Sequence, residues 1–193
     1  MKPFQGLDSL SGFPDIYETS ILQLLARKFL EWEIILDGKL DFSSVSPHCR
    51  RPIVYANGCF DLLHAGHIAL LLKGKEIAGT GSLVVAVDTD DRVVQRKRGR
   101  PINFIGERLI SVASLECVDY VTPFDPLIGS ELVRALSPDY WLHGFDPEKP
   151  ETRELPALEL THFKGKIVQI PHCSQLSTTH LIGRVANYLE GMN

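Results

Sequence analysis

The sequence predicts an α/β protein with a doubly wound parallel sheet of about five strands, helices on both faces of the sheet and an N-terminal helical extension. Short apolar runs alternate with amphipathic segments throughout residues 52–193. The first apolar run ends in a turn, residues 57–67, that contains two glycines and two histidines. Residues 1–51 lack this alternation. Strands that alternate with helices form parallel sheets with right-handed connections, and this predicts the fold class.

Residues 1–51 are predicted to be a helical extension and linker, and residues 52–193 the main domain. Apolar residues recur at three- and four-residue spacing over residues 14–40, as an amphipathic helix requires: Ile16, Leu22, Leu25, Phe29, Trp32 and Leu36. The polar residues 41–51 are typical of a linker.

The elements of the main domain follow from changes in hydrophobic periodicity. Strands are predicted over residues 53–56, 83–87, 118–122, 140–142 and 167–170, and helices over 67–78, 105–116, 127–136, within 151–160 and over 177–189. Such a sheet is Rossmann-like, and ligands bind beyond the carboxyl ends of its strands. The turn at residues 57–67 follows the first strand directly, so it is the predicted site.

Composition and charge exclude several classes of protein. With 193 residues, 44% apolar residues and a formal charge of −4, the chain fits a globular fold without general affinity for nucleic acid or anionic membranes. The four cysteines (Cys49, Cys59, Cys117 and Cys173) are widely spaced, which argues against a zinc knuckle or a disulfide scaffold. We therefore expect a cytoplasmic protein, with neither an export signal nor a membrane-spanning segment.

The two histidines of the turn suit a phosphate ligand. His64 and His67 are three residues apart, so they lie on one face if the helix begins near His64. A helix start offers unpaired N–H groups and a positive dipole, Gly58 permits a tight turn, and Gly66 permits close approach of a ligand. A surface histidine beside a helix cap, or a metal-binding pair, is the alternative interpretation.

The full string Asn57-Gly58-Cys59-Phe60-Asp61-Leu62-Leu63-His64-Ala65-Gly66-His67 resembles the signature of the nucleotidyltransferase superfamily with the HxGH motif. The resemblance continues through residues 84–90, Gly99-Arg100-Pro101, Glu107-Arg108, residues 115–121 and Ser177-Thr178-Thr179, and so covers about 52–189. Within the superfamily the chain is similar to the cytidylyltransferase-like group, above all to the nucleotidyltransferase domain of ADP-heptose synthases.

This resemblance implies transfer of a nucleotidyl group from a nucleoside triphosphate to a sugar 1-phosphate, releasing pyrophosphate and forming a product such as ADP-heptose. A phosphate monoester has a second pKa of about 6, so the attacking group is already anionic and needs no general base. The histidines are then donors that stabilise charge in the transition state. Cytidylyl transfer to glycerol 3-phosphate or another alcohol phosphate, and a non-catalytic nucleotide-binding scaffold, are the alternatives.

The resemblance also implies roles for individual residues. The catalytic residues are His64, His67 and Lys97. The nucleotide-binding residues are Asn57, Gly58, Cys59, Phe60, Gly66, Arg108, His143, Gly144, Asp146, Ser177, Thr178 and Thr179. The substrate-binding residues are Asp61, Asp90, Arg98 and Arg100. Mg²⁺ is expected to bind through triphosphate oxygens, with few protein ligands.

Some of these roles have a purely structural alternative. Ser177 caps a helix in either case, and Arg108 can pair with a neighbouring glutamate on the surface. Residues 96–100 can be a solvated basic turn, and Asp61 can serve only to hold the turn in which it lies. These alternatives stay open at the level of the sequence.

Departures from the family pattern leave the base and the sugar undetermined. His143-Gly144-Phe145-Asp146 stands where related heptose enzymes have lysine-glycine-glycine-aspartate, Gln175 replaces a glycine, and His172 replaces an arginine of the glycerol phosphate enzymes. A homodimer is the family's usual state. Residues 1–51 are too few for the sugar kinase domain of bifunctional ADP-heptose synthases, so we expect a separate kinase.

Overall fold

The computed structural model describes residues 15–30, 33–34, 40–41, 49–149, 152, 160–171 and 177–192. Within them a parallel five-stranded sheet has the order β5-β4-β3-β6-β7. Its strands are β3 (Ile53–Gly58), β4 (Ser82–Asp88), β5 (Tyr120–Phe124), β6 (Tyr140–Phe145) and β7 (Lys166–Pro171). The chain adds β4 and β5 on one side of β3, then returns to add β6 and β7 on the other. The carboxyl ends of β3 and β6 therefore flank the point where the strand order reverses, which is where such sheets bind ligands.

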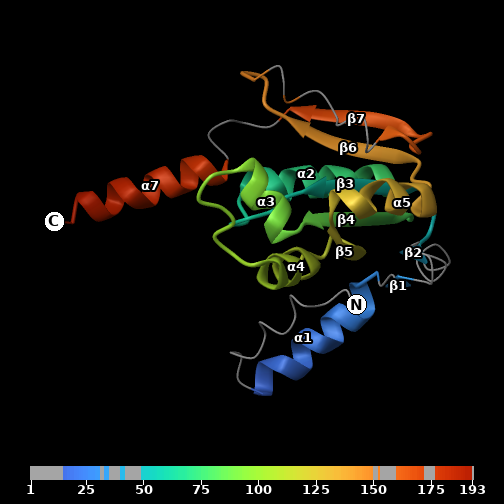
Figure 1. The fold of residues 1–193 in the computed structure, drawn as a ribbon, viewed down its shortest axis with the longest axis horizontal. Helices are drawn as coiled ribbons and strands as arrows, with labels where there is room; N and C mark the ends of the chain where they lie inside the picture. The colour runs from blue at the N-terminus through green and yellow to red at the C-terminus, as the bar shows by residue number, and fades with distance from the viewer. Residues whose placement is uncertain are drawn as a thin grey trace.

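Helices cover both faces of the sheet, and the predicted fold class is confirmed (Figure 1). The helices that follow the strands are α2 (Ala65–Ala78), α3 (Asp90–Arg96), α4 (Ile105–Ala113), α5 (Pro126–Leu136) and α7 (Thr178–Glu190). Val54 and Ala56 of β3 pack in a core with α2 and α4, whereas Ile53 and Tyr55 face a second core with α5. This alternation follows from the two-residue period of a strand that is buried on both faces.

The N-terminal helix α1 (Asp15–Lys28) is shorter than the helix predicted over residues 14–40, and this prediction is corrected. The chain leaves the helix to pair with the edge of the sheet: Phe29 forms a parallel bridge with Val121 of β5, and the N–H of Leu30 donates to the Val121 carbonyl at 3.0 Å. The unpaired backbone groups of an edge strand favour such an extended partner, which helical spacing in the sequence does not reveal.

Short strands β1 (Glu33–Ile34) and β2 (Leu40–Asp41) follow α1 and pair antiparallel, also inside the range that was predicted to be helical. Leu25 and Leu30 are buried in the two cores, and the Nζ of Lys28 donates to the Leu115 carbonyl at 2.9 Å. Helix α1 and the two residues that follow it are thus packed onto the main domain, and a domain boundary at residue 51 stays a prediction.

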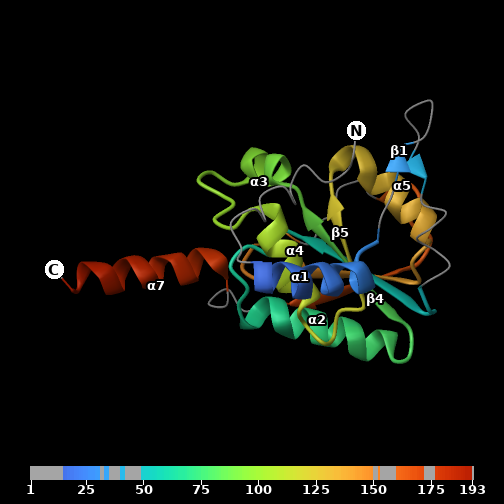
Figure 2. The ribbon, with the colours of Figure 1, turned by 90° about the horizontal axis from the view of Figure 1, so that it is seen from below.

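Helix α7 differs from the other helices because it extends away from the sheet in both views (Figures 1 and 2). It begins as predicted, with Ser177 as its N-cap. The helix predicted within residues 151–160 lies almost entirely outside the described residues, as do His172, Cys173 and Gln175. No helix in the described part of the chain is long and apolar enough to cross a membrane.

Candidate active site

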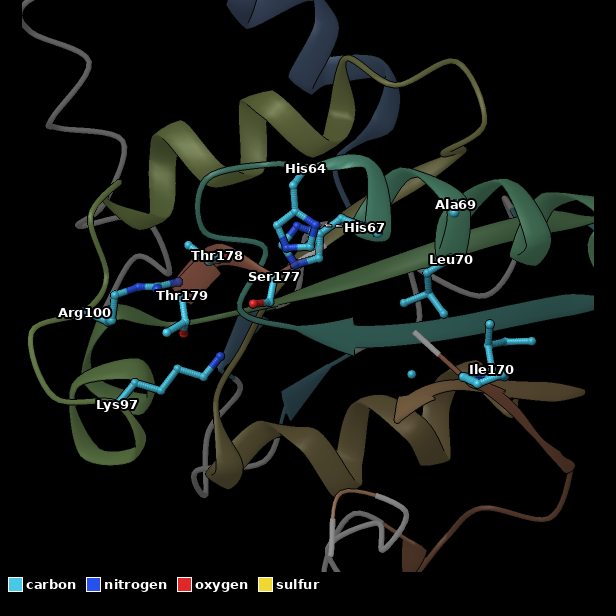
Figure 3. A pocket seen from close by; sticks show the side chains of 13 residues that line it. His64, His67, Ala69, Leu70, Lys97, Arg100, Ile170, Ser177, Thr178 and Thr179 are labelled. Atoms are coloured by element: carbon cyan, nitrogen blue, oxygen red, sulfur yellow. Dashed lines mark hydrogen bonds between the residues drawn. The ribbon is translucent and has the colours of Figure 1, made fainter. Parts of the chain in front are cut away.

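A pocket of about 290 Å³ opens where the strand order reverses. Its walls come from the start of α2, the segment after α3, the ends of β6 and β7 and the start of α7 (Figure 3). The lining residues are His64, Gly66, His67, Ala69, Leu70, Lys97, Arg100, Gly144, Ile170, Pro171, Ser177, Thr178 and Thr179. The volume is close to the lower end of the range of small-molecule sites, about 300 Å³. Nine of these lining residues were predicted from the sequence.

The histidines of the turn form a stacked pair in the pocket wall. His64 is the N-cap of α2, and its Nδ1 accepts a long hydrogen bond of 3.4 Å from the backbone N–H of His67. The two histidine rings stack with their centroids 3.7 Å apart, and the ring of Phe60 packs against that of His67 with a centroid distance of 5.2 Å. If Nδ1 of His64 is the acceptor, the neutral ring carries its proton on Nε2 and can donate it to a ligand.

The turn that carries the histidines is strained and contains a buried carboxylate. Phe60 and Leu62 both have positive φ, 49° and 47°, a conformation that is costly for residues with side chains. Asp61 lies between them with a fully buried side chain. Its carboxylate accepts hydrogen bonds from Nε of Arg100 at 2.5 Å and from the backbone N–H groups of residues 102 and 103, each at 2.9 Å.

Asp61 is therefore a charged anchor behind the pocket rather than part of its lining. Burial raises its pKa, but the hydrogen bonds from the N–H groups of Asn103 and Ile102 and the interaction with Arg100 outweigh that effect and lower the pKa below its ordinary value. The backbone carbonyl of Asp61 also accepts a hydrogen bond of 2.7 Å from the hydroxyl of Thr178, at the start of α7.

Arg108 is a second buried anchor. Its side chain is fully buried and donates to the Cys59 carbonyl at 2.6 Å, to Oδ1 of Asp90 at 2.6 Å and to the Asn103 carbonyl at 2.9 Å. These contacts join the turn after β3, the start of α3 and the loop before α4. In this conformation Arg108 and Asp90 bind each other and do not line the pocket.

The position of Lys97 is set by α3. Arg92 of that helix is buried, donates from Nε to Asp88 at 2.9 Å and lies over the ring of Phe124. Burial raises the pKa of Asp88, and the positive charges of Arg92 and Arg96 partly offset this effect. Lys97 follows the helix and lines the pocket, whereas Arg98 is exposed and does not.

The remaining predicted residues lie beside the pocket and are engaged within the fold. Asn57 accepts a hydrogen bond from Nε1 of Trp141 at 3.2 Å. A ring nitrogen of His143 lies 2.6 Å from the Thr152 carbonyl, and the N–H of Asp146 donates to the Thr152 hydroxyl at 2.8 Å. Cys59 and Phe60 are buried. Among these, only Gly144 of the β6 end reaches the pocket.

Sequence reasoning missed the apolar wall of the pocket. Ala69 and Leu70 on α2 face Ile170 and Pro171 at the end of β7. In the sequence such residues resemble any others of an amphipathic helix or a buried strand, so nothing marks them as ligand contacts. Within the described residues no cluster of three or more histidine, cysteine or acidic side chains is placed to hold a metal ion.

Comparison with known proteins identifies the family of the chain. Residues 55–184 match the family described as cytidylyltransferase-like. The chain is 37% identical over 157 residues to D-beta-D-heptose 1-phosphate adenylyltransferase of Bordetella bronchiseptica, a match that covers 80% of this chain and 94% of that protein. It is 38% identical over 140 residues to the bifunctional protein HldE of Desulfatibacillum aliphaticivorans, covering 71% of this chain and 27% of that protein.

The chain thus spans about a quarter of the bifunctional relative and nearly all of the single-function one. Among solved structures, the lipopolysaccharide core biosynthesis protein from Thermoplasma volcanium superposes with a TM-score of 0.52 and 28% identity, covering 63% of this chain and 98% of that one. The family match over residues 55–184 and the identity to the Bordetella bronchiseptica protein show that the chain belongs to the cytidylyltransferase-like family of nucleotidyltransferases.

Proposed function

We propose that the protein transfers an adenylyl group from ATP to D-beta-D-heptose 1-phosphate, forming ADP-heptose and releasing pyrophosphate. The observation that carries this proposal is a pocket at the switch point of the sheet whose lining contains both HxGH histidines, two basic side chains and the start of a helix. The identity to the Bordetella bronchiseptica adenylyltransferase over 94% of its length supports the choice of substrates.

The pocket has two chemically different halves, which suit the two ends of a nucleotide. Lys97, Arg100 and Thr179 lie on one side of the histidine pair, and Leu70 and Ile170 lie on the other (Figure 3). The first half offers cations, hydroxyls and the N-terminal dipole of α7 to phosphates. The second offers an apolar surface to the base, so the α-phosphate would lie near the histidines.

The reaction is an in-line displacement that needs no proton transfer. An anionic phosphate oxygen of the heptose 1-phosphate forms a bond to the α-phosphorus of ATP while the bond from that phosphorus to the oxygen bridging to the β-phosphate breaks. Pyrophosphate leaves with the bonding electron pair. His64, His67 and Lys97 would stabilise the negative charge that builds on the α-phosphate and the leaving group, the usual protein contribution to phosphoryl chemistry.

Magnesium would enter this site as part of the nucleotide substrate. The lining residues in the described part of the chain include no carboxylate, and Mg²⁺ commonly binds through substrate phosphates with few protein ligands. Among the lining side chains, Ser177 and Thr179 have hydroxyl oxygens that could bind this ion. Chelation of Mg²⁺ should therefore abolish turnover without lowering the melting temperature of the nucleotide-free protein.

The proposal is tested by incubating the protein with each of the four common nucleoside triphosphates and with heptose 1-phosphate or glycerol 3-phosphate, while measuring pyrophosphate. Release with ATP and heptose 1-phosphate is expected. Release that needs CTP and glycerol 3-phosphate would replace the proposal by the cytidylyl alternative. Nucleotide binding without release from any pair would favour the non-catalytic scaffold.

We also propose that the protein forms a homodimer in the cytoplasm and takes its heptose 1-phosphate from a separate kinase. Among the described cysteines, Cys49, Cys59 and Cys117 form no disulfide bond, which favours a reducing compartment. The exposed apolar side chains Ile182, Val185 and Leu189 recur at three- and four-residue spacing along α7 and offer a surface for a second copy. Light scattering of the purified protein measures its mass in solution, and a monomer at micromolar concentration would exclude the dimer.

A further inference from the structure

Asp61 connects two segments of the site that are far apart in the chain. The donors to its carboxylate belong to residues 100–103, about forty positions later, and the donor to its carbonyl is Thr178, separated from it by 117 positions. The first segment begins with Arg100, one of the two cations that line the pocket, and the second begins α7. A single residue thus joins the two elements that face the phosphate half of the pocket.

Arg100 is held by this contact in a fixed orientation. Its side chain is only 9% exposed, and its Nε points at the fully buried carboxylate. Among the described residues Asp61 is the one hydrogen-bond acceptor of this guanidinium, and Arg100 also lines the pocket. A guanidinium can pair with a carboxylate and still present parallel donors to a phosphate, which a lysine cannot do.

The backbone around Asp61 requires such a framework. The positive φ angles of Phe60 and Leu62 flank it on both sides, and this conformation persists where the surrounding structure holds it. Contacts to Asp61 hold this strained turn, which leads into His64 two residues after Leu62. The same contacts therefore affect the histidine pair, the cations and the start of α7.

We propose that Asp61 is a positioning residue, which fixes Arg100 and the first turn of α7 around one triphosphate. It does not itself touch the substrate, because its side chain is buried behind the wall of the pocket. This inference rests on the proposed function for the identity of the ligand. The contact on which it depends, between the Asp61 carboxylate and Arg100, can be tested without any substrate.

The first test is limited proteolysis of the nucleotide-free protein with trypsin. Lys97 and Arg98 are exposed cleavage sites next to the segment that Asp61 holds. Asp61→Asn should increase the cleavage rate after these residues by at least about fivefold, because release of residues 100–103 lets the neighbouring backbone unfold locally into the active site of the protease. Cleavage after Lys73 in α2 and Arg134 in α5 reports global unfolding and should not change.

A second variant covers the case in which Asp61→Asn does not fold. Arg100→Lys keeps a positive charge but lacks the guanidinium fork, and should increase cleavage after Lys97 and Arg98 to a similar extent. Faster cleavage at Lys73 and Arg134 as well would show that Asp61→Asn unfolds, and Arg100→Lys then decides. Unchanged cleavage after Lys97 and Arg98 in the folded variants would overturn the proposal.

The second test measures the affinity for Mg·ATP, with no sugar phosphate present. Asp61→Asn and Arg100→Lys should each weaken binding by about tenfold, and the double variant by about tenfold rather than about a hundredfold, because both changes break one contact. A loss of about a hundredfold in the double variant would mean that Asp61 acts independently of Arg100, which contradicts the proposal. If ATP binds in this pattern but heptose 1-phosphate is not a substrate, the proposed function fails and the positioning role of Asp61 stands.

Discussion

Ionisable side chains stand both in the wall of the pocket and in the layer directly behind it, but in opposite situations. Lys97 and the two histidines line the pocket. Asp61 and Arg108 lie behind this wall. Both side chains are fully buried and form their hydrogen bonds with other groups of the protein. The residues of the wall line the space that a ligand would fill, and those behind it determine where the wall stands. Burial, and not residue type, separates the two roles.

The sharpest way to test this comparison is to remove one ring of the histidine pair. His67→Ala should lower the turnover number by about 10²–10³-fold, the usual effect of losing one donor to a charged transition state. The melting temperature and the affinity for ATP should change little, because the ring lies in the wall. Lys73→Ala, an exposed change on the same helix, is the matched control. Turnover that survives in His67→Ala would contradict the assigned role.

Replacing an arginine of the buried layer should instead affect stability. Arg108→Leu leaves Asp90 and two backbone carbonyls without their donor, and we expect a loss of about 3 kcal/mol in the free energy of unfolding. Urea denaturation measures this loss. Arg98→Leu removes an exposed arginine near the same site and should be close to neutral. If the Arg108→Leu variant is as stable as the wild type and differs only in a higher KM for ATP, Arg108 contacts the nucleotide and is not a structural anchor.

A smaller effect is expected from the lysine of the wall. Lys97→Met should lower kcat/KM for ATP by about tenfold, equivalent to about 1.4 kcal/mol of transition-state stabilisation, with no change in unfolding. Arg98→Met is the matched control, since Arg98 carries the same charge one position later and does not line the pocket. Equal effects of the two changes would show that the segment acts only through its overall charge.

The smallest effect concerns acid stability. The folded-state pKa of Asp61 is lowered, so the stability that its ionised form contributes is complete above the unfolded value of about 3.9 and is lost as the pH falls through the folded value. The free energy of unfolding should therefore fall less steeply below about pH 4 in Asp61→Asn than in the wild type. If the free energy of unfolding falls equally steeply with decreasing pH in both proteins, Asp61 is not held by ionic contacts.

The sequence was sufficient to predict the features that depend on local pattern. Alternating periodicity predicted the five strands and their order of appearance, the glycine and histidine spacing located the turn after β3, and Ser177 marked the start of α7. It did not predict where α1 ends, because that depends on the unpaired edge of β5.

Features that depend on tertiary packing were beyond reach. Arg100 ends the basic run at residues 96–100 and Arg108 follows it in the sequence, yet Arg100 lines the pocket and Arg108 is buried against the turn after β3. The apolar wall of Leu70 and Ile170 combines residues a hundred positions apart that have no polar group to mark them. His143 lies close to the pocket in the fold, but its ring meets Thr152 instead.

Labelled ATP tests most directly whether adenylyl transfer to heptose 1-phosphate takes place in this pocket. With ATP labelled at the α-phosphorus, the label should appear in a nucleotide sugar. With ATP labelled at the γ-phosphorus, it should appear in pyrophosphate. His67→Ala should slow both by the same factor. Appearance of the γ label on the sugar phosphate, or of neither label outside ATP, would contradict the account.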